Sequence, residues 1–274
     1  MFFAGVALGG LLAAGPSAFV GSEGRALALA TASAALIGAG ANAINDVFDV
    51  EIDRVNRPDR PLPAGVLSVG AARVFWGLTS GAGVGLSAWL SPLHVAIAVG
   101  SVALLYGYSA RLKRTALFGN LAVAAVLGLA ILYGGLAVSP AAWSVPLLGA
   151  AFAFGSTLAR EVAKDIEDAV GDATGGARTL PLVAGPQIAV WVAVAAVGAT
   201  LASFPLALVA GLGADFFALG LPAAGLLLAA AWALLGAPNA LLRRRAGRAS
   251  ALLKAAMVAG ILALAAARLV DGTW

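Results

Sequence analysis

The chain contains no cysteine and carries little charge. Of its 274 residues, 61% are hydrophobic and only 11% are charged, and the mean hydropathy is +0.97. The lack of cysteine excludes disulfide bridges and thiolate metal sites. A soluble domain of this length would carry roughly twice this charged fraction. The composition therefore excludes an ordinary soluble enzyme and indicates a membrane protein.

Apolar runs of about 20 residues, enough to cross a hydrocarbon core of about 30 Å, recur along the chain. They lack the alternating polar positions of a barrel strand, which excludes a porin-like protein. We predict an all-α polytopic membrane protein in which residues 1–274 form a single transmembrane domain. Its nine transmembrane helices form a bundle with a polar cap on the cytoplasmic side. The predicted spans are residues 2–20, 26–43, 66–90, 95–108, 116–138, 142–158, 188–209, 216–235 and 251–269.

Lysine and arginine are distributed asymmetrically over the predicted loops. Fifteen of the 17 lie in or beside the loops that follow the second, fourth, sixth and eighth spans, and only Arg25 and Arg268 lie on the other side. Because basic loops stay in the cytoplasm, we expect a cell-membrane protein with a cytoplasmic N-terminus and an outside C-terminus. Such loops also explain the net charge of +4, so we expect no nucleic-acid partner.

The acidic residues are concentrated in two segments, 45–65 and 160–181, which contain ten of the chain's 13 acids. The first reads NDVFDVEIDRVNRPDRPLPAG. Three aspartates in each segment repeat the same spacing of three and four residues: Asp46, Asp49 and Asp53, then Asp165, Asp168 and Asp172. Because the two segments follow spans four helices apart, their parent helices point the same way. This suggests a parallel internal repeat, and it predicts that both segments lie on the cytoplasmic face.

Residues spaced four apart drift only about 40° around a helix, so Asn45, Asp49 and Asp53 are predicted to share one face. Carboxylates packed this closely repel one another unless cations are present. Mg²⁺ binds through one or two carboxylates and keeps positions open for substrate phosphates. Two facing clusters therefore predict two Mg²⁺ sites that grip one phosphorylated ligand. Asp46 and Asp165 are further candidates to bind or support the ions.

Basic side chains on the acidic side of the membrane fit the same ligand. They are Arg57, Arg60, Lys113, Arg114, Arg160, Lys164 and Arg178. Each one alone is also typical of an orienting loop. As a set that alternates with paired acids, they are predicted to neutralise phosphate oxygens.

A polyphosphate held above a bundle of apolar helices indicates a lipid with a diphosphate head. If the tail is allylic, Mg²⁺ and basic residues stabilise the departing diphosphate. The resulting carbocation needs aromatic faces and exclusion of water. The chain's three tyrosines, Tyr106, Tyr108 and Tyr133, are candidates for those faces. The alternative, that they are packing or interfacial tyrosines, stays open.

The segment from Asn45 to Asp53, with the arginines and prolines of residues 56–63, resembles the first signature of the UbiA superfamily of intramembrane prenyltransferases. Asp168 and Asp172, followed by Gly176-Ala-Arg178-Thr, resemble the second signature. The basic loop 108–114 is similar to the family's loop between the fourth and fifth helices. The resemblance implies Mg²⁺-dependent prenyl transfer, with Asn45, Asp49 and Asp53 on one ion and Asp168 and Asp172 on the other.

Within the superfamily, the segment KDIEDAVGD at 164–172 is most similar to archaeal digeranylgeranylglyceryl phosphate synthases. The partners implied are geranylgeranyl diphosphate as donor, and geranylgeranylglyceryl phosphate as the lipophilic acceptor in archaeal ether-lipid synthesis. Similar segments occur in branches that prenylate aromatic acids, quinone precursors and chlorophyll, so an aromatic acceptor is an alternative. A non-enzymatic transporter is a further alternative, although transporter acids usually lie near the membrane midplane.

Overall fold

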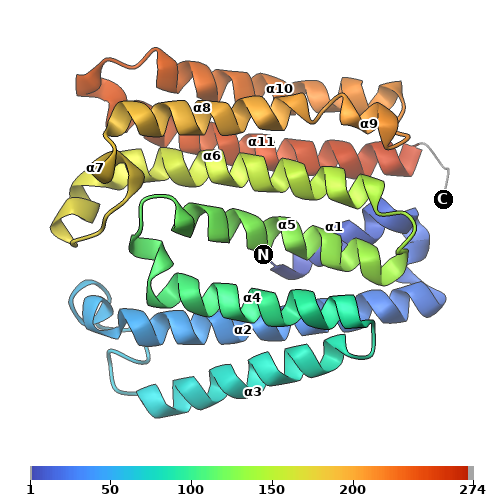
Figure 1. The fold of residues 1–274 in the computed structure, drawn as a ribbon, viewed down its shortest axis with the longest axis horizontal. Helices are drawn as coiled ribbons and strands as arrows, with labels where there is room; N and C mark the ends of the chain where they lie inside the picture. Colours follow the sequence, from blue (N-terminus) through green and yellow to red (C-terminus); the bar gives the residue numbers. More distant parts are fainter. Residues whose placement is uncertain (1, 271–274) are drawn as a thin grey trace.

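The computed structural model describes residues 2–270, which form a bundle of helices and contain no strand within that range (Figure 1). The long helices are α1 (Phe2–Ala14), α2 (Gly21–Asn56), α3 (Val69–Ser87), α4 (Pro92–Ala110), α5 (Phe118–Val138), α6 (Ser144–Thr174), α8 (Pro186–Ala202), α10 (Ala214–Leu235) and α11 (Leu242–Val270). Short helical turns connect them: η1 (Gly15–Phe19), η2 (Leu112–Arg114), α7 (Leu180–Val183), α9 (Leu206–Val209) and η3 (Asn239–Leu241).

Six helical segments among the described residues are long and apolar enough to cross a membrane: Gly21–Asn56, Pro92–Ala110, Phe118–Val138, Pro186–Val209, Ala214–Leu235 and Leu242–Val270. The predicted all-α, multi-pass membrane architecture is confirmed at this level, and the count of nine spans stays a prediction. Serine caps set two of the helix starts. Ser68 accepts a hydrogen bond from the amide of Ala71, and Ser91 accepts one from that of His94. Each cap satisfies a backbone donor that the first helical turn leaves unpaired.

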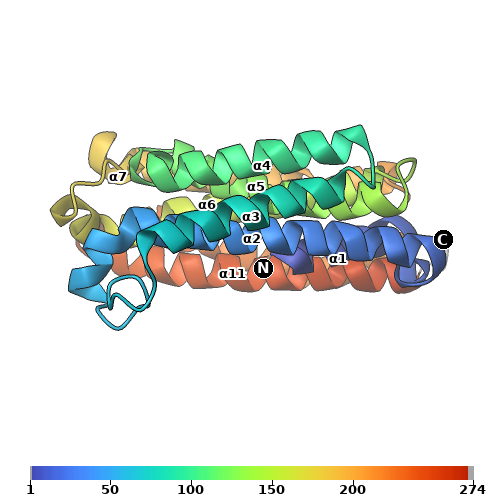
Figure 2. The same cartoon turned by 90° about the horizontal axis from the view of Figure 1, so that it is seen from below.

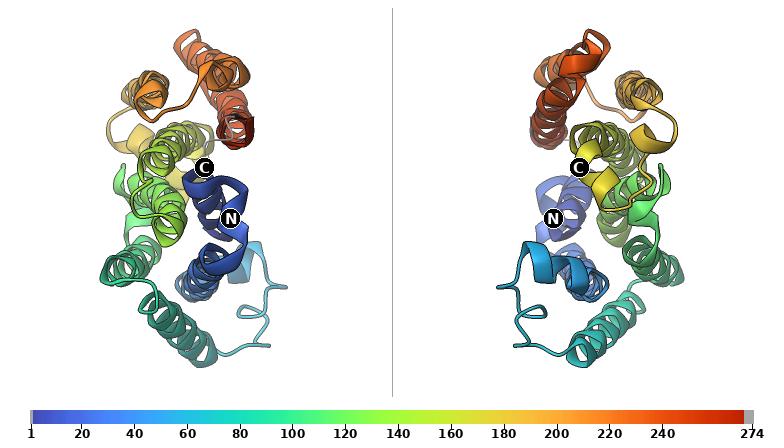
Figure 3. Two further views of the ribbon diagram at one scale, coloured as in Figure 1. Left: turned by 90° about the vertical axis from the view of Figure 1, so that its right-hand side faces the viewer. Right: turned by 90° about the vertical axis from the view of Figure 1, so that its left-hand side faces the viewer.

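The helices run along the long axis of the molecule, as two perpendicular views show (Figures 1 and 2). In the half that contains α6, α8, α10 and α11, the largest buried cluster includes Val162, Ile166, Val190, Leu227 and Leu253. In the other half, α1 packs against α5 and α2 packs against α3. Helix α5 contacts both α2 and α6, so it links the two halves. In the end-on views the two halves lie toward opposite ends of an elongated section, with α5 between them (Figure 3).

Glycine allows α1 and α5 to approach closely. A Cβ atom at Gly134 would lie within 2.6 Å of the carbonyl carbon of Val6, and a Cβ atom at Gly9 would collide with the backbone of Ile131. Small residues at helix interfaces are how membrane helices gain van der Waals contact where no hydrophobic driving force acts between them. Any larger side chain at Gly134 would push α1 away from α5.

One end of the bundle, the polar end, carries the loops 57–68, 111–117, 175–185 and 236–241 (Figure 1, left). Helices α2 and α6 are the two that continue through the acidic segments, as far as Asn56 and Thr174. The loops are also tied together, because the amide of Arg178 donates to the carbonyl oxygen of Arg114 at 3.0 Å. The fold therefore brings both acidic segments and the basic loop to the same end of the molecule.

Candidate active site

The first acidic cluster lies on the last turns of α2. Asn45 and Asp49 are one turn apart, and the Asn45 Nδ2 donates to the Asp49 Oδ2 at 3.0 Å. Lys113, from η2, donates through Nζ to the Asp49 Oδ1 at 2.5 Å and to the Asn45 Oδ1 at 3.1 Å. Two oxygen atoms from α2 thus converge on one positive charge.

These three side chains stand at the polar end of a cavity of about 310 Å³ between α2, α4 and α5. Below them the walls become apolar, with Leu105 and Val126 among the lining residues. We call this space the active-site cavity. A charged rim above apolar walls suits a molecule with an ionic head and a hydrocarbon tail.

Asp53 and Asp46 face a different partner. The Arg60 Nη1 donates to the Asp53 Oδ2 at 2.7 Å and to the Asp46 Oδ1 at 3.2 Å. The reason lies in the helix geometry: Asn45 and Asp53, eight residues apart, diverge by about 80°, whereas Asp46 and Asp53 differ by only about 20°. The predicted triad Asn45, Asp49 and Asp53 is therefore divided between the Lys113 side and the Arg60 side of α2.

A second cavity, also of about 310 Å³, lies on the Arg60 side between α2 and α3. Asp46, Asp53 and Arg60 line its polar end, and Phe75 lines its apolar part. It has the same division into charged and apolar parts as the active-site cavity.

The second acidic cluster lies on the last turns of α6. Lys164 Nζ donates to the Asp168 Oδ2 at 2.5 Å, one helical turn away, and Arg160 pairs with the neighbouring Glu161. Asn120 of α5 donates through Nδ2 to the Asp165 Oδ2 at 2.8 Å.

Burial above all, together with the charges of Asp172, Glu161 and Asp168, raises the pKa of Asp165 to about 6, and the hydrogen bond from Asn120 opposes this shift. Burial and the charge of Asp168 also raise the pKa of Asp172. Burial is the largest cause of both shifts, because it disfavours the charged form of each carboxylate.

Tyr108 of α4 lines the active-site cavity beside Asp49 and Lys113. Carboxylates of both acidic segments lie near enough to influence its phenol: Glu161 and Asp165 of α6, and Asp49 of α2. The remaining predicted diphosphate-binding residues Arg57, Arg114 and Arg178 are exposed at the polar end.

The other two tyrosines have different surroundings. Tyr106 packs against Phe48 and Trp76, with ring centroids 5.5 and 5.3 Å apart. It is two residues from Tyr108, which places it about 200° away around α4. Tyr133 is buried deep in the bundle, where its hydroxyl lies 2.9 Å from Ser33 Oγ. Of the three, Tyr108 alone lines the active-site cavity.

The donor atoms fit a magnesium ion. They are carboxylate and amide oxygens, which hard divalent cations prefer. Asn45 Oδ1 and Asp49 Oδ1 already share one cation, the Lys113 ammonium. Within residues 2–270, no group of three or more His, Cys, Asp or Glu side chains is arranged to enclose a metal. Each cluster would thus rely on water or phosphate oxygens to complete an octahedral shell, as Mg²⁺ sites usually do.

Two polar residues near the site were not among the predicted ligands. Asn42 lines the active-site cavity, and Asn120 orients Asp165. Arg60, which was predicted to neutralise phosphate oxygens, bridges Asp46 and Asp53. The signal for the two asparagines was an amide within an otherwise apolar helix, which is costly in a membrane unless it has a partner. The pairing of Arg60 depends on how the loop 57–68 folds, and its sequence position carries no signal for it.

Comparison with known proteins identifies the relatives of this chain. Residues 3–254 match the UbiA prenyltransferase family. Digeranylgeranylglyceryl phosphate synthase of Methanopyrus kandleri is 41% identical, over 88% of this chain and 87% of that protein. A solved structure of digeranylgeranylglyceryl phosphate synthase is 28% identical, with a TM-score of 0.87 over 98% of this chain and 93% of that one.

A UbiA homologue from Archaeoglobus fulgidus, bound to DMAPP and Mg²⁺, has the same fold. It is 19% identical, and the TM-score is 0.67 over 95% of this chain and 94% of that one. Together with the match over most of the sequence, these similarities agree with the helical bundle. The chain belongs to the UbiA prenyltransferase family.

Proposed function

We propose that this protein transfers a geranylgeranyl group from geranylgeranyl diphosphate to geranylgeranylglyceryl phosphate, the second ether-forming step of archaeal lipid synthesis. The observation that carries the proposal is the convergence of Asn45, Asp49 and Lys113 at the head of a cavity with apolar walls. The choice of substrates rests on relatives named digeranylgeranylglyceryl phosphate synthase, such as the one that is 41% identical.

In this proposal two Mg²⁺ ions bind, one at each acidic cluster. Asn45 and Asp49 hold the first ion, with Asp53 as the third ligand that the family pattern implies. Asp168 and Asp172 hold the second ion, and Asp46 and Asp165 are the supporting carboxylates, Asp46 from the Arg60 side of α2. When bound, the ions supply positive charge that makes the diphosphate a better leaving group.

The chain's own basic residues bind the same head group. Lys113 already points into the cavity and can donate to a diphosphate oxygen. Charge-assisted hydrogen bonds of this kind are about twice as strong as neutral ones. Around Lys113 the diphosphate is surrounded by the further basic side chains Arg57, Arg114, Arg160, Lys164 and Arg178.

Transfer breaks the bond between C1 of the donor and the diphosphate oxygen, and it forms an ether bond from C1 to the acceptor hydroxyl. The hydroxyl proton passes to the released diphosphate or to a carboxylate of the two clusters. Tyr108 presents a ring at the rim of the cavity, where it can stabilise positive charge developing on C1. The apolar walls exclude water, which would otherwise capture that carbon.

The finer topology belongs to the same proposal. Residues 1–274 form one domain that crosses the cell membrane nine times, with the polar end and N-terminus in the cytoplasm and the C-terminus outside. The basic loops gathered at the polar end support this orientation. Helices α2 and α6 both run toward that end and carry the same aspartate spacing, which supports a parallel internal repeat (Figure 1).

The test uses purified protein in liposomes with labelled geranylgeranyl diphosphate. The acceptors are geranylgeranylglyceryl phosphate and 4-hydroxybenzoate, each with Mg²⁺ and with a chelator. We expect Mg²⁺-dependent label in a lipid with two ether-linked chains. Label in the aromatic acid alone would keep the reaction and replace the acceptor, and no transfer to either from folded protein would contradict the proposal.

A further inference from the structure

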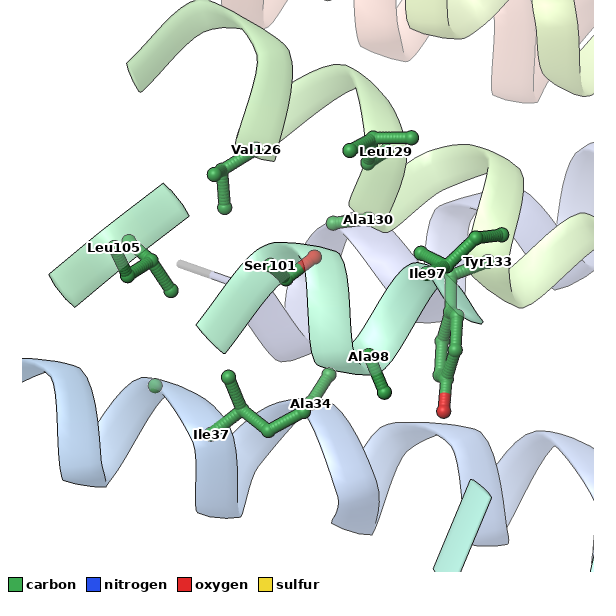
Figure 4. A pocket seen from close by; sticks show the side chains of 11 residues that line it. Ala34, Ile37, Ile97, Ala98, Ser101, Leu105, Val126, Leu129, Ala130 and Tyr133 are labelled. Atoms are coloured by element: carbon green, nitrogen blue, oxygen red, sulfur yellow. The ribbon is translucent and has the colours of Figure 1, made fainter. Parts of the chain in front are cut away.

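A narrow apolar space continues the active-site cavity toward the opposite end of the bundle. The two spaces share the wall residues Leu105 and Val126. The deeper one, the apolar slot, lies between α2, α4 and α5 and is lined by residues such as Ile37 and Ser101 (Figure 4). Its volume is about 40 Å³, against about 310 Å³ for the active-site cavity, so it is a narrow extension of that cavity. A tail that starts beside Asp49 would therefore extend into this slot.

Tyr133 closes the slot at the end far from Leu105 and Val126, and its ring points toward α2 (Figure 4). Only 4% of the residue is exposed. The Ser33 hydroxyl donates to the carbonyl oxygen of Gly83 at 2.7 Å, so it accepts the hydrogen of the Tyr133 hydroxyl, 2.9 Å away. The phenol is thus fixed to both α2 and α3.

His94 fixes the same tyrosine from its main-chain side. Its Nε2 lies 3.2 Å from the carbonyl oxygen of Tyr133, so Nε2 carries the hydrogen and donates. Nδ1 then accepts from the Ser91 hydroxyl at 2.8 Å, and the imidazole and phenol centroids are 4.8 Å apart. Because Tyr133 is held at its hydroxyl, its ring and its main chain, it forms a floor that resists displacement.

The depth of this floor corresponds to a definite tail length. Ser33 lies 16 residues before Asp49 on the same helix, which is about 24 Å at 1.5 Å per residue. An extended isoprene unit spans four carbon–carbon bonds and advances about 5 Å. Four units need about 20 Å by the same arithmetic and fit above Tyr133, whereas five need about 25 Å and would meet its ring.

We propose that Tyr133, fixed by Ser33 and His94, limits the donor to four isoprene units. This inference rests on the proposed prenyl transfer and adds the residue that selects the chain length. Ser101 lies seven residues below Tyr108 on α4, about 10 Å deeper. A larger side chain at Ser101 would therefore block the slot at roughly half the depth at which Tyr133 closes it.

The experiment compares kcat/KM for donors with one, three, four and five isoprene units. For Tyr133→Ala we expect the five-unit to four-unit ratio to rise by about tenfold or more, the scale on which apolar pockets discriminate size. Tyr133→Phe keeps the ring and loses only the bond to Ser33, so its ratio should match the wild type. Ser101→Leu should lower the four-unit to one-unit ratio by about tenfold, because only the longer tail passes that level.

Unchanged kcat/KM ratios in both Tyr133→Ala and Ser101→Leu would contradict the proposal that Tyr133 limits the length of the donor tail. Ser101→Leu gives an independent answer if Tyr133→Ala does not fold. If the wild type transfers no donor, the proposed function fails, and binding still tests the slot. Thermal stabilisation by unreactive thiolo-diphosphates should then grow up to four units and drop at five in the wild type; growth through five units would contradict the inference.

Discussion

The two acidic clusters have the same aspartate spacing but different surroundings. In the first, Asp49 faces a cavity and shares Lys113 with Asn45, whereas Asp53 turns to Arg60. In the second, Asp168 pairs with Lys164 of its own helix, and each of these side chains is 46% exposed. The Lys113 side chain is only 14% exposed.

This difference shows that spacing along a helix fixes the direction of a carboxylate but not its partner. The partner is supplied by other elements: η2 for Asp49, the loop 57–68 for Asp53, and α5 for Asp165. A partner that comes from another element and is shielded from solvent holds its carboxylate more firmly than an exposed partner one turn away. We therefore expect the first cluster to be the preorganised half of the site, and the second to order on ligand binding.

The largest effect is expected from removing one ligand in each cluster. Asp49→Ala and Asp168→Ala should each lower kcat by a factor on the order of 10²–10³, because each removes charge stabilisation from the departing diphosphate. Turnover by purified protein in liposomes measures this. Glu51→Ala is the matched control, because Glu51 lies on α2 between the aspartates yet pairs with Arg54 at the surface. Near-normal activity in either aspartate variant would contradict the two-cluster site.

Next in size is the contrast between the two lysines. Lys113→Met should raise the KM for the donor by about 10–100-fold, because it removes a shielded, charge-assisted hydrogen bond. Lys164→Met should change it by less than about fivefold, since exposed ion pairs contribute little. Steady-state kinetics at saturating acceptor gives both values. Equal effects of the two substitutions would remove the proposed difference between the clusters.

A smaller effect separates the two roles open to Asp53. If Asp53 completes the first magnesium site, Asp53→Asn should raise the Mg²⁺ concentration for half-maximal activity by about tenfold. Arg60→Gln, which removes the partner and keeps the carboxylate, should leave that concentration unchanged. A Mg²⁺ titration of each variant decides the point. If both variants lose the same modest share of activity and neither shifts the Mg²⁺ requirement, then Asp53 serves only to hold the loop 57–68 through Arg60.

The smallest effect concerns Asp165 in metal-free protein. Burial raises its folded pKa to about 6, above the ordinary value of 3.8, so the folded state binds the proton more tightly. Stability is therefore highest when Asp165 is protonated, and it falls as the pH rises from about 4 to about 6. Asp165→Asn should raise the Tm by about 2–4 °C at pH 7 and not at pH 4. The same gain at both pH values would contradict the assignment.

The sequence contains the helical positions of the predicted site residues but not the contacts that they make. The 3.6-residue period of a helix was enough to place Asn45 and Asp49 on one face, and it also implies that Tyr106 and Tyr108, about 200° apart, point in different directions. The depth of Tyr133 in the bundle follows from its position 15 residues into α5. The positions of Lys113, Arg60 and Asn120 depend on how separate elements pack, so no local pattern could assign their partners.

The burial of His94 carries no signal in the sequence. The residue follows Ser91 and Pro92 in the first turn of α4, at the end opposite the acids. In the structure it is 3% exposed and fixes Tyr133. Its role follows from the packing of α4 against α5, which brings the first turn of one helix beside the last turns of the other. Such contacts arise only after the helices assemble.

The measurement that tests the central claim most directly is equilibrium binding of geranylgeranyl thiolo-diphosphate, with and without Mg²⁺. It is made on the wild type, Asp49→Ala and Asp168→Ala. If both clusters hold one diphosphate through magnesium, the wild type binds only with Mg²⁺, and each variant loses that dependence together with most of its affinity. Metal-independent binding by the wild type, or full Mg²⁺-dependent affinity in the Asp168→Ala variant, would contradict this account.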